Sequence, residues 1–128
     1  MYPDVIALLR DHLLPVVSPR QVASRIPDPR PDEWVQLRRV GGVQRRPVRD
    51  APNVDVFCWA LTDPAAWELA DLVRRSIHSL AGTATLGLVV YRVQEMLGPT
   101  STDDPLTGTP RVWATYTIDV RADDAIAR

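Results

Sequence analysis

The chain has 128 residues, of which 45% are hydrophobic and 24% are charged, and its 15 basic and 16 acidic side chains leave a net charge of −1. A chain of this length and composition is typical of one globular domain that can bury a core. The near-zero net charge excludes a general attraction to nucleic acid or to a membrane surface, so any electrostatic function must come from local clusters of charge.

The first element that the sequence predicts is a short helix over residues 3–14. Pro3 suits the first helical turn, and Pro15 is expected to end the helix because proline lacks the N–H that a helix interior needs. The apolar stripe that would face the core repeats at helical spacing and consists of Val5, Leu8, Leu9 and Leu13.

Three short strands are predicted next, and a proline-rich stretch, R-I-P-D-P-R-P-D at 25–32, runs from the first into the second. Proline favours extended chain in the residue before it, so this stretch predicts an extended connection and no helix. The strands are expected over Gln21–Ile26, Trp34–Val40 and Val54–Ala60. The second should close at a turn made by Gly41-Gly42. In the third, Phe57 and Trp59 share the face that alternates with the apolar one, which indicates that this face is covered too.

The strongest helical signal lies over residues 64–81. Asp63 can cap this helix, Pro64 can start it and Gly82 can stop it. Its apolar residues recur at steps of three and four, which is the spacing of one buried helix face, and they are Ala66, Ala70, Val73, Ile77 and Leu80.

Two further strands, Leu88–Met96 and Arg111–Val120, complete the predicted fold. The last alternates cleanly between apolar and polar residues, as expected for an antiparallel sheet with one packed face. The residues between them, 98–110, are rich in Pro, Gly, Thr and Ser and predict a flexible hairpin loop. The element order is therefore α-β-β-β-α-β-β. It predicts an α+β fold over 1–128, with helices packed on a mostly antiparallel sheet.

The side chains that could carry chemistry are scattered. His12, Cys58 and His78 fall in different elements, so the sequence predicts no metal site and no cofactor. Cys58 is the only cysteine, which excludes an internal disulfide and agrees with a reducing compartment. No nucleophile motif and no phosphate-binding loop is present, and the chain is not expected to be an enzyme. No secretory signal is visible, and no apolar run approaches the roughly 20 residues that a membrane span needs.

The one concentration of charge lies around Gly41-Gly42. All basic residues of the chain are Arg, and five of them flank this expected turn, so a hairpin would gather them at one end: Arg38, Arg39, Arg45, Arg46 and Arg49. Guanidinium groups pair well with carboxylates or phosphates, although a solvated hairpin end explains the cluster equally well. We add an exposed Trp113 and the adjacent carboxylates Asp103 and Asp104 to these arginines as candidate assembly contacts.

Several ordered stretches resemble one group of viral proteins. They are M-Y-P-D-V at 1–5, R-I-P-D-P-R-P-D at 25–32, V-Q-L-R-R-V-G-G at 35–42, V-D-V-F-C-W-A at 54–60 and the helix containing A-W-E-L-A that follows. Together they resemble small neck and tail-completion proteins of tailed phages, especially of actinobacterial phages, and among these the tail terminator family. The resemblance covers about residues 1–96, and the final hairpin matches by element order.

The resemblance implies a structural virion protein with an α+β fold and no catalytic residue. Such proteins form a ring, typically hexameric, at the head-proximal end of the tail tube, where they stop tube growth and dock to the neck of the head. The implied partners are other copies of the chain, the tail tube protein and a neck or stopper protein. Phage DNA would pass through the channel without sequence-specific binding. The implied location is the virion tail or neck, assembled in the host cytoplasm.

Other functions remain open at this stage. The neighbouring neck stoppers and head–tail connectors are also small proteins of the same class. From different classes, a small DNA-binding or adaptor module and a small enzyme remain as alternatives. Oligomeric state separates them, because a ring of about six copies favours the terminator, whereas a monomer with salt-sensitive affinity for DNA favours the module.

Overall fold

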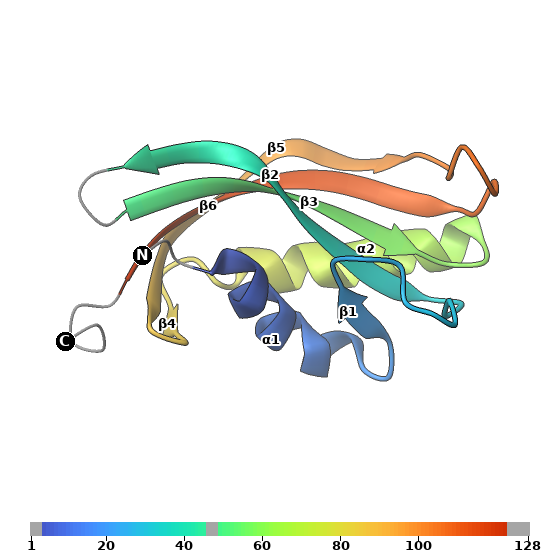
Figure 1. The fold of residues 1–128 in the computed structure, drawn as a ribbon, viewed down its shortest axis with the longest axis horizontal. Coiled ribbons are helices and arrows are strands. Elements are labelled where there is room, and N and C mark those ends of the chain that lie inside the picture. The colour runs from blue at the N-terminus through green and yellow to red at the C-terminus, as the bar shows by residue number, and fades with distance from the viewer. Residues whose placement is uncertain (1–3, 46–48, 123–128) are drawn as a thin grey trace.

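The computed structural model describes the backbone of residues 4–45 and 49–122 and the side chains of residues 4–41 and 50–121. Figure 1 shows a curled sheet with the helices lying against one of its faces. The elements in chain order are α1 (Val5–Val17), β1 (Gln21–Ala23), β2 (Trp34–Arg45), β3 (Arg49–Trp59), α2 (Asp63–His78), β4 (Ala84–Thr85), β5 (Leu88–Ser101) and β6 (Arg111–Ala122). The predicted α+β class and element order are confirmed, with the two-residue β4 as an addition.

The sheet has six strands in the order β1-β2-β3-β6-β5-β4. Every neighbouring pair is antiparallel except β1 and β2, which run parallel. The two long hairpins, β2–β3 and β5–β6, meet where β3 pairs with β6 in the middle of the sheet. This arrangement leaves one face for the helices and one face free of them, which we call the open face.

The core lies between the helices and the sheet. The predicted stripe of α1 is buried, and so is the predicted stripe of α2. The predicted alternation of β6 is also confirmed. The residues that it sends into the core are at most 5% exposed and are Val112, Ala114, Tyr116, Ile118 and Val120. Burial of one apolar set from every central strand accounts for the register of the sheet, because a slip by one residue would turn these side chains to the other face.

Helix α1 starts and ends later than predicted. Asp4 caps it by accepting a hydrogen bond from the backbone N–H of Ala7 at 3.0 Å, while Pro3 lies outside the described residues. The helix continues through Pro15 to Val17, so the predicted end at Pro15 is wrong. Pro15 sits in the last turn, where its missing N–H costs one backbone bond. The complete burial of Val17 helps to offset that loss.

Helix α2 is confirmed with different ends. Thr62 is the cap residue in place of Asp63, and its side chain accepts from the backbone N–H of Ala65 at 3.3 Å. The helix ends at His78, and Leu80 is buried within the turn that follows. Gly82 adopts a positive φ of 82°, which suits the reversal of the chain toward β5.

The predicted turn at Gly41-Gly42 is wrong, because β2 runs past it to Arg45. The pairing with β3 shifts between Arg39 and Gly42, which is a bulge, and Gly41 has a φ of 111° that favours glycine. Strand β3 starts at Arg49, earlier than predicted, so the turn of this hairpin falls on 46–48, outside the described residues. Two other boundaries differ: β1 ends at Ala23, and β5 continues to Ser101, inside the predicted loop 98–110.

Candidate assembly surface

The open face carries four large aromatic side chains from three neighbouring strands. Trp34 of β2 stacks on Trp59 of β3 with ring centroids 5.6 Å apart. Phe57 of β3 stacks on Trp113 of β6 at 5.9 Å. Strand alternation explains this layer, because the neighbours of these residues along each strand are buried in the core on the opposite face.

Two arginines cover this aromatic layer. The guanidinium of Arg30, from the proline-rich segment, lies 4.7 Å from the centre of the Trp59 ring. The guanidinium of Arg111 lies 4.8 Å from the Phe57 ring and 5.1 Å from the Trp59 ring. Cation–π contacts of this kind stabilise the layer and keep charge at its surface. The sequence predicts that the face carrying Phe57 and Trp59 is covered. Arginines of the same chain provide that cover, most completely over Trp59.

Trp113 is half-buried, so the expectation of an exposed Trp113 is wrong. Its stacking on Phe57 removes part of the ring from solvent. Three buried donor atoms on this part of the open face have no hydrogen-bond partner within the described residues: Arg30 Nη2, Trp34 Nε1 and Trp113 Nε1. Buried donors are normally satisfied by protein or by ordered water, so this region has unused hydrogen-bonding capacity.

The middle of the open face is polar and internally bonded. Thr115 donates to Asp55 at 2.5 Å, and Thr117 donates to Asn53 at 2.6 Å, in both cases between β6 and β3. Gln36 of β2 accepts from the Trp59 indole at 3.2 Å and donates to the backbone of Ser24 at 3.1 Å. These hydrogen bonds hold the polar side chains of the open face in place between the aromatic layer and the end of the β2–β3 hairpin.

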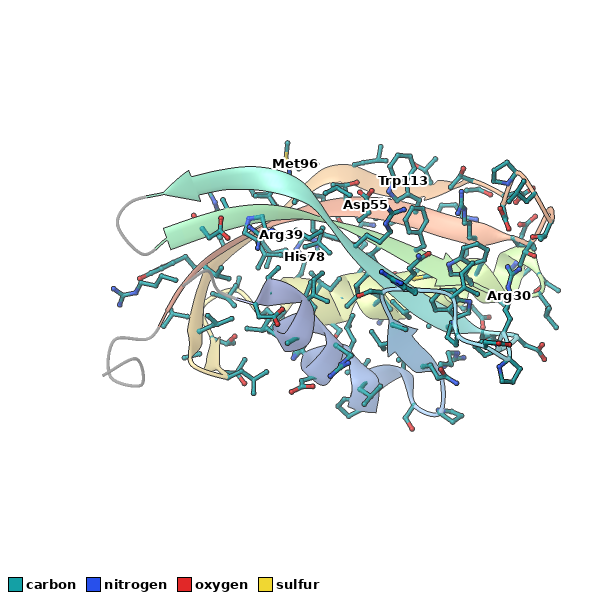
Figure 2. All side chains as sticks on the ribbon, in the orientation of Figure 1. Arg30, Arg39, Asp55, His78, Met96 and Trp113 are labelled. Carbon is teal, nitrogen blue, oxygen red and sulfur yellow. The ribbon has the colours of Figure 1, made fainter. Side chains whose placement is uncertain are left out.

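The candidate arginines of β2 do not point the same way. Arg38 lies opposite Asp55, so it is on the open face. Arg39 lies on the helix side, as Figure 2 shows, and its guanidinium donates to Asp50 at 2.7 Å. Asp50 is 2% exposed, so Arg39 neutralises a buried carboxylate. Sequence reasoning missed this ion pair, although the alternation of residues along β2 could have separated Arg38 from Arg39.

Two other candidate arginines, Arg45 and Arg49, lie at the described end of the β2–β3 hairpin. Arg45 and Arg49 are direct backbone partners in the β2–β3 pairing, while Arg46 lies outside the described residues. Figure 1 shows that this hairpin projects beyond the ends of both helices. The structure therefore keeps Arg45 and Arg49 together at a projecting tip and separates Arg38 and Arg39 from each other.

The candidate carboxylates lie in the loop between β5 and β6. Asp104 accepts from the Thr107 hydroxyl at 2.7 Å and from the backbone N–H of Leu106 at 3.2 Å, and these bonds lower the pKa of Asp104. Asp103 is exposed. Asp104 therefore organises its own turn, and of the two carboxylates Asp103 faces solvent.

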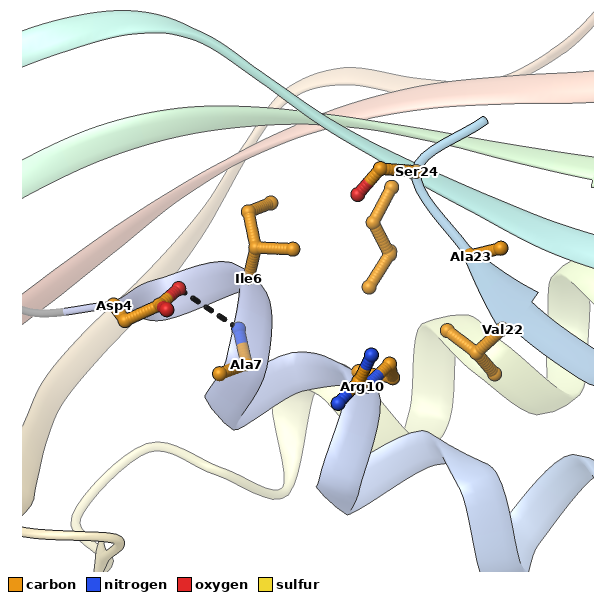
Figure 3. A pocket seen from close by; sticks show the side chains of 8 residues that line it. Asp4, Ile6, Ala7, Arg10, Val22, Ala23 and Ser24 are labelled. Atoms are coloured by element: carbon orange, nitrogen blue, oxygen red, sulfur yellow. Dashed lines mark hydrogen bonds between the residues drawn. The ribbon is translucent and has the colours of Figure 1, made fainter. Parts of the chain in front are cut away.

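A cavity of about 180 Å³ lies at the other side of the sheet, between α1 and the β1 edge. Figure 3 shows Asp4, Ile6 and Arg10 of α1 on one side and Val22 to Ser24 on the other. The Asp4 carboxylate is already occupied as the cap of α1. The residues that line the cavity include no nucleophile with a base beside it, so the cavity lacks a catalytic arrangement.

The titratable side chains that the sequence suggested have structural partners. His12 contacts the backbone oxygen of Ser76 at 2.9 Å, and burial raises the pKa of the Cys58 thiol to about 12. His78 contacts Glu95 at 2.9 Å, and Arg74 forms two hydrogen bonds to the same carboxylate. Among the described residues, no three His, Cys, Asp or Glu side chains are placed to hold a metal ion. In that same part of the chain, no helix is long and apolar enough to cross a membrane.

Comparison with known proteins gives one match. The model of a family described as phage tail termination protein matches residues 1–126, which is nearly the whole chain and includes both helices and every strand. No curated protein matches the chain.

Proposed function

The chain belongs to the phage tail termination protein family, and from this premise we propose that its copies close into a hexameric ring at the head-proximal end of the tail tube. The ring stops the growth of the tube and presents the surface to which the neck of the head docks. Its partners are the tail tube protein on one side and a neck or stopper protein on the other. Phage DNA passes through the channel without sequence-specific binding, and assembly takes place in the host cytoplasm.

The observation that carries this proposal is the extent of the family match, which spans residues 1–126. The match includes the final hairpin as well as the two helices. The character of the surface supports the same function. Arg30 and Arg111 lie over the stacked aromatic rings of the open face, and the β2–β3 hairpin projects from the sheet. Arginine is among the residues enriched where proteins contact one another. A structural role needs no chemistry, so we propose that the protein is not an enzyme.

We propose that the tip of the β2–β3 hairpin docks to carboxylates of an adjoining ring. Arg45, Arg46 and Arg49 are close together in the sequence, and Arg45 and Arg49 are backbone partners. Guanidinium groups form charge-assisted hydrogen bonds with the carboxylates of a neighbouring protein. Protein contact also suits a channel better than tight phosphate binding, since DNA must slide through it. Asp103, exposed in the β5–β6 loop, is the candidate contact of opposite sign.

The proposed function is tested by adding the purified protein to growing tail tubes. The expected result is that tubes of defined length are capped by a ring at one end and then stop elongating. The double variant Arg45→Ala with Arg46→Ala should fold normally but join tails to heads poorly, because the hairpin tip no longer pairs with its neighbour. Tubes that elongate equally with and without the protein would contradict termination. A ring found on head connectors and absent from tubes would show a neck stopper.

A further inference from the structure

We propose that neighbouring copies in the ring meet through two different surfaces: the open face of one copy packs against the helix layer, α1 and α2, of the next. This inference rests on the proposed ring and adds the identity of its subunit contact. It follows from the opposite charge of the two surfaces and from the apolar side chains that each leaves exposed.

The open face is basic. Arg38 and Arg92 are exposed, and neither has an ion-pair partner among the described residues. Arg30, Arg111 and Arg121 lie over aromatic rings of this side, the last at 5.5 Å from the Tyr91 ring. The carboxylates of this face are Asp55, bonded to Thr115, Asp119, which is 7% exposed, and Asp104. Hydrogen bonds from Thr107 and Leu106 lower the pKa of Asp104, and the nearby charges of Arg111 and Arg30 lower it further. The five arginines named above outnumber these three carboxylates, so the open face keeps a net positive charge.

The helix layer is acidic. Its exposed carboxylates are Asp4, Asp11, Asp63, Glu68 and Asp71, and its exposed guanidinium groups are Arg10, Arg74 and Arg75. Two of these guanidinium groups are already engaged, because Arg74 binds Glu95 and Arg75 binds Asp71 at 2.7 Å. In the described structure Asp11, Asp63 and Glu68 have no ion-pair partner. The outer surface of α2 thus offers carboxylates that could receive the arginines of a neighbouring open face.

Each surface also exposes large apolar side chains beside its charges. On the helix layer, Trp67 is 42% exposed, next to Glu68, and Leu61, just before α2, is 64% exposed. On the sheet, Met96 is 64% exposed, and Figure 2 shows it on the side of β5 away from the helices. An interface needs such a dry centre within a charged rim, and tryptophan and methionine are among the residues enriched there.

The charge pattern also decides the symmetry of the contact. A two-fold contact would place the open face against itself, and the arginines of both copies would then repel each other. A contact between the open face of one copy and the helix layer of the next brings opposite charges together. A pair of subunits joined in this way still has one free open face and one free helix layer. Such a head-to-tail contact can be repeated until it closes, which is how rings with more than two subunits form.

Charge reversal on each surface tests this inference. One variant carries Arg38→Glu with Arg92→Glu on the open face, and the other carries Glu68→Arg with Asp71→Arg on α2. The control variants are Asp28→Arg and Asp32→Arg, singly and together, which reverse exposed charges in the segment between β1 and β2. Circular dichroism checks that every variant is folded. Mass photometry then measures the protein concentration at which half of the subunits are in rings.

Each double variant alone should need at least about tenfold more protein than the wild type to form rings, and the controls should behave as wild type. An equimolar mixture of the two double variants should recover the ring, because every contact is complementary when the variants alternate. The ring of the mixture should contain equal numbers of the two variants in native mass spectrometry.

Two results would overturn the inference while leaving the proposed function intact. One is that both double variants form rings at the same protein concentration as the wild type. The other is a mixture that stays dissociated although both variants are folded. A wild-type protein that is monomeric both in solution and on tails would instead contradict the ring itself, so the two failures are distinguishable.

Discussion

The neighbouring residues Arg38 and Arg39 should differ sharply in their effect on folding when each is replaced by alanine. Arg39 donates to Asp50, whose side chain is 2% exposed, whereas the Arg39 side chain is 36% exposed. After Arg39→Ala the carboxylate keeps, among the described residues, one hydrogen bond, from the backbone N–H of Ala51 at 3.0 Å. Loss of one partner costs about 3–5 kcal/mol in a buried ion pair and about 0–1 kcal/mol in an exposed one.

Because Arg39 is partly exposed, we expect a loss of about 2 kcal/mol, which is a change of about 30-fold in the folding equilibrium. Arg38→Ala is the matched control, since Arg38 has no ion-pair partner among the described residues, and we expect less than about 0.5 kcal/mol. Urea unfolding at a protein concentration that keeps the chain monomeric measures both, because association would add its own stabilisation. The double variant Arg39→Ala with Asp50→Asn should recover part of the loss by removing the buried charge. Equal losses for Arg38→Ala and Arg39→Ala would refute the reasoning.

Three further predictions concern two titratable side chains and one loop. Hydrogen bonds from Arg74 and His78 lower the pKa of Glu95 below its ordinary value of 4.5, so its contribution to stability is present above that pH and is lost as the pH falls through the lower, folded-state pKa. Urea unfolding from pH 6 to pH 2 should therefore be less pH-dependent for Glu95→Gln, and an unchanged slope would contradict this. Burial raises the pKa of Cys58 to about 12, so a thiol reagent at pH 8 should label native protein far more slowly than urea-unfolded protein, and equal labelling rates would contradict its burial. Residues 102–110, the part of the predicted loop that lies beyond β5, should be mobile in the free protein and become ordered in the assembled tail; backbone order parameters of about 0.85 in the free protein would show that this is wrong.

The fold could be predicted from sequence largely because two patterns are strong. The helical repeat over 64–81 and the alternation over 111–120 both match buried faces of the structure, and local chemistry is enough to produce them. Boundaries were less predictable, because tertiary packing decides them. The burial of Val17 continues α1 past Pro15, and pairing with β3 carries β2 through Gly41-Gly42 as a bulge.

The candidate surface was predictable only in part. The arginines do cluster in the sequence, but strand alternation and the bulge decide which of them share a face of the sheet. Arg39 therefore lies on the helix side, where it binds the buried Asp50. The position of Arg30 and Arg111 over the Trp59 ring could not be predicted from the sequence. Both arginines are distant from Trp59 in the sequence, and they are distant from each other. Contacts of that kind depend on the path of the whole chain, and no local pattern encodes them.

Electron micrographs of the purified protein mixed with tail tubes test whether the protein closes the tube as a ring. We expect closed rings of six subunits, seen alone or seated at one end of each tube, with tube length fixed once the ring is bound. Monomers that never associate with tube ends, while the tubes continue to grow, would contradict it.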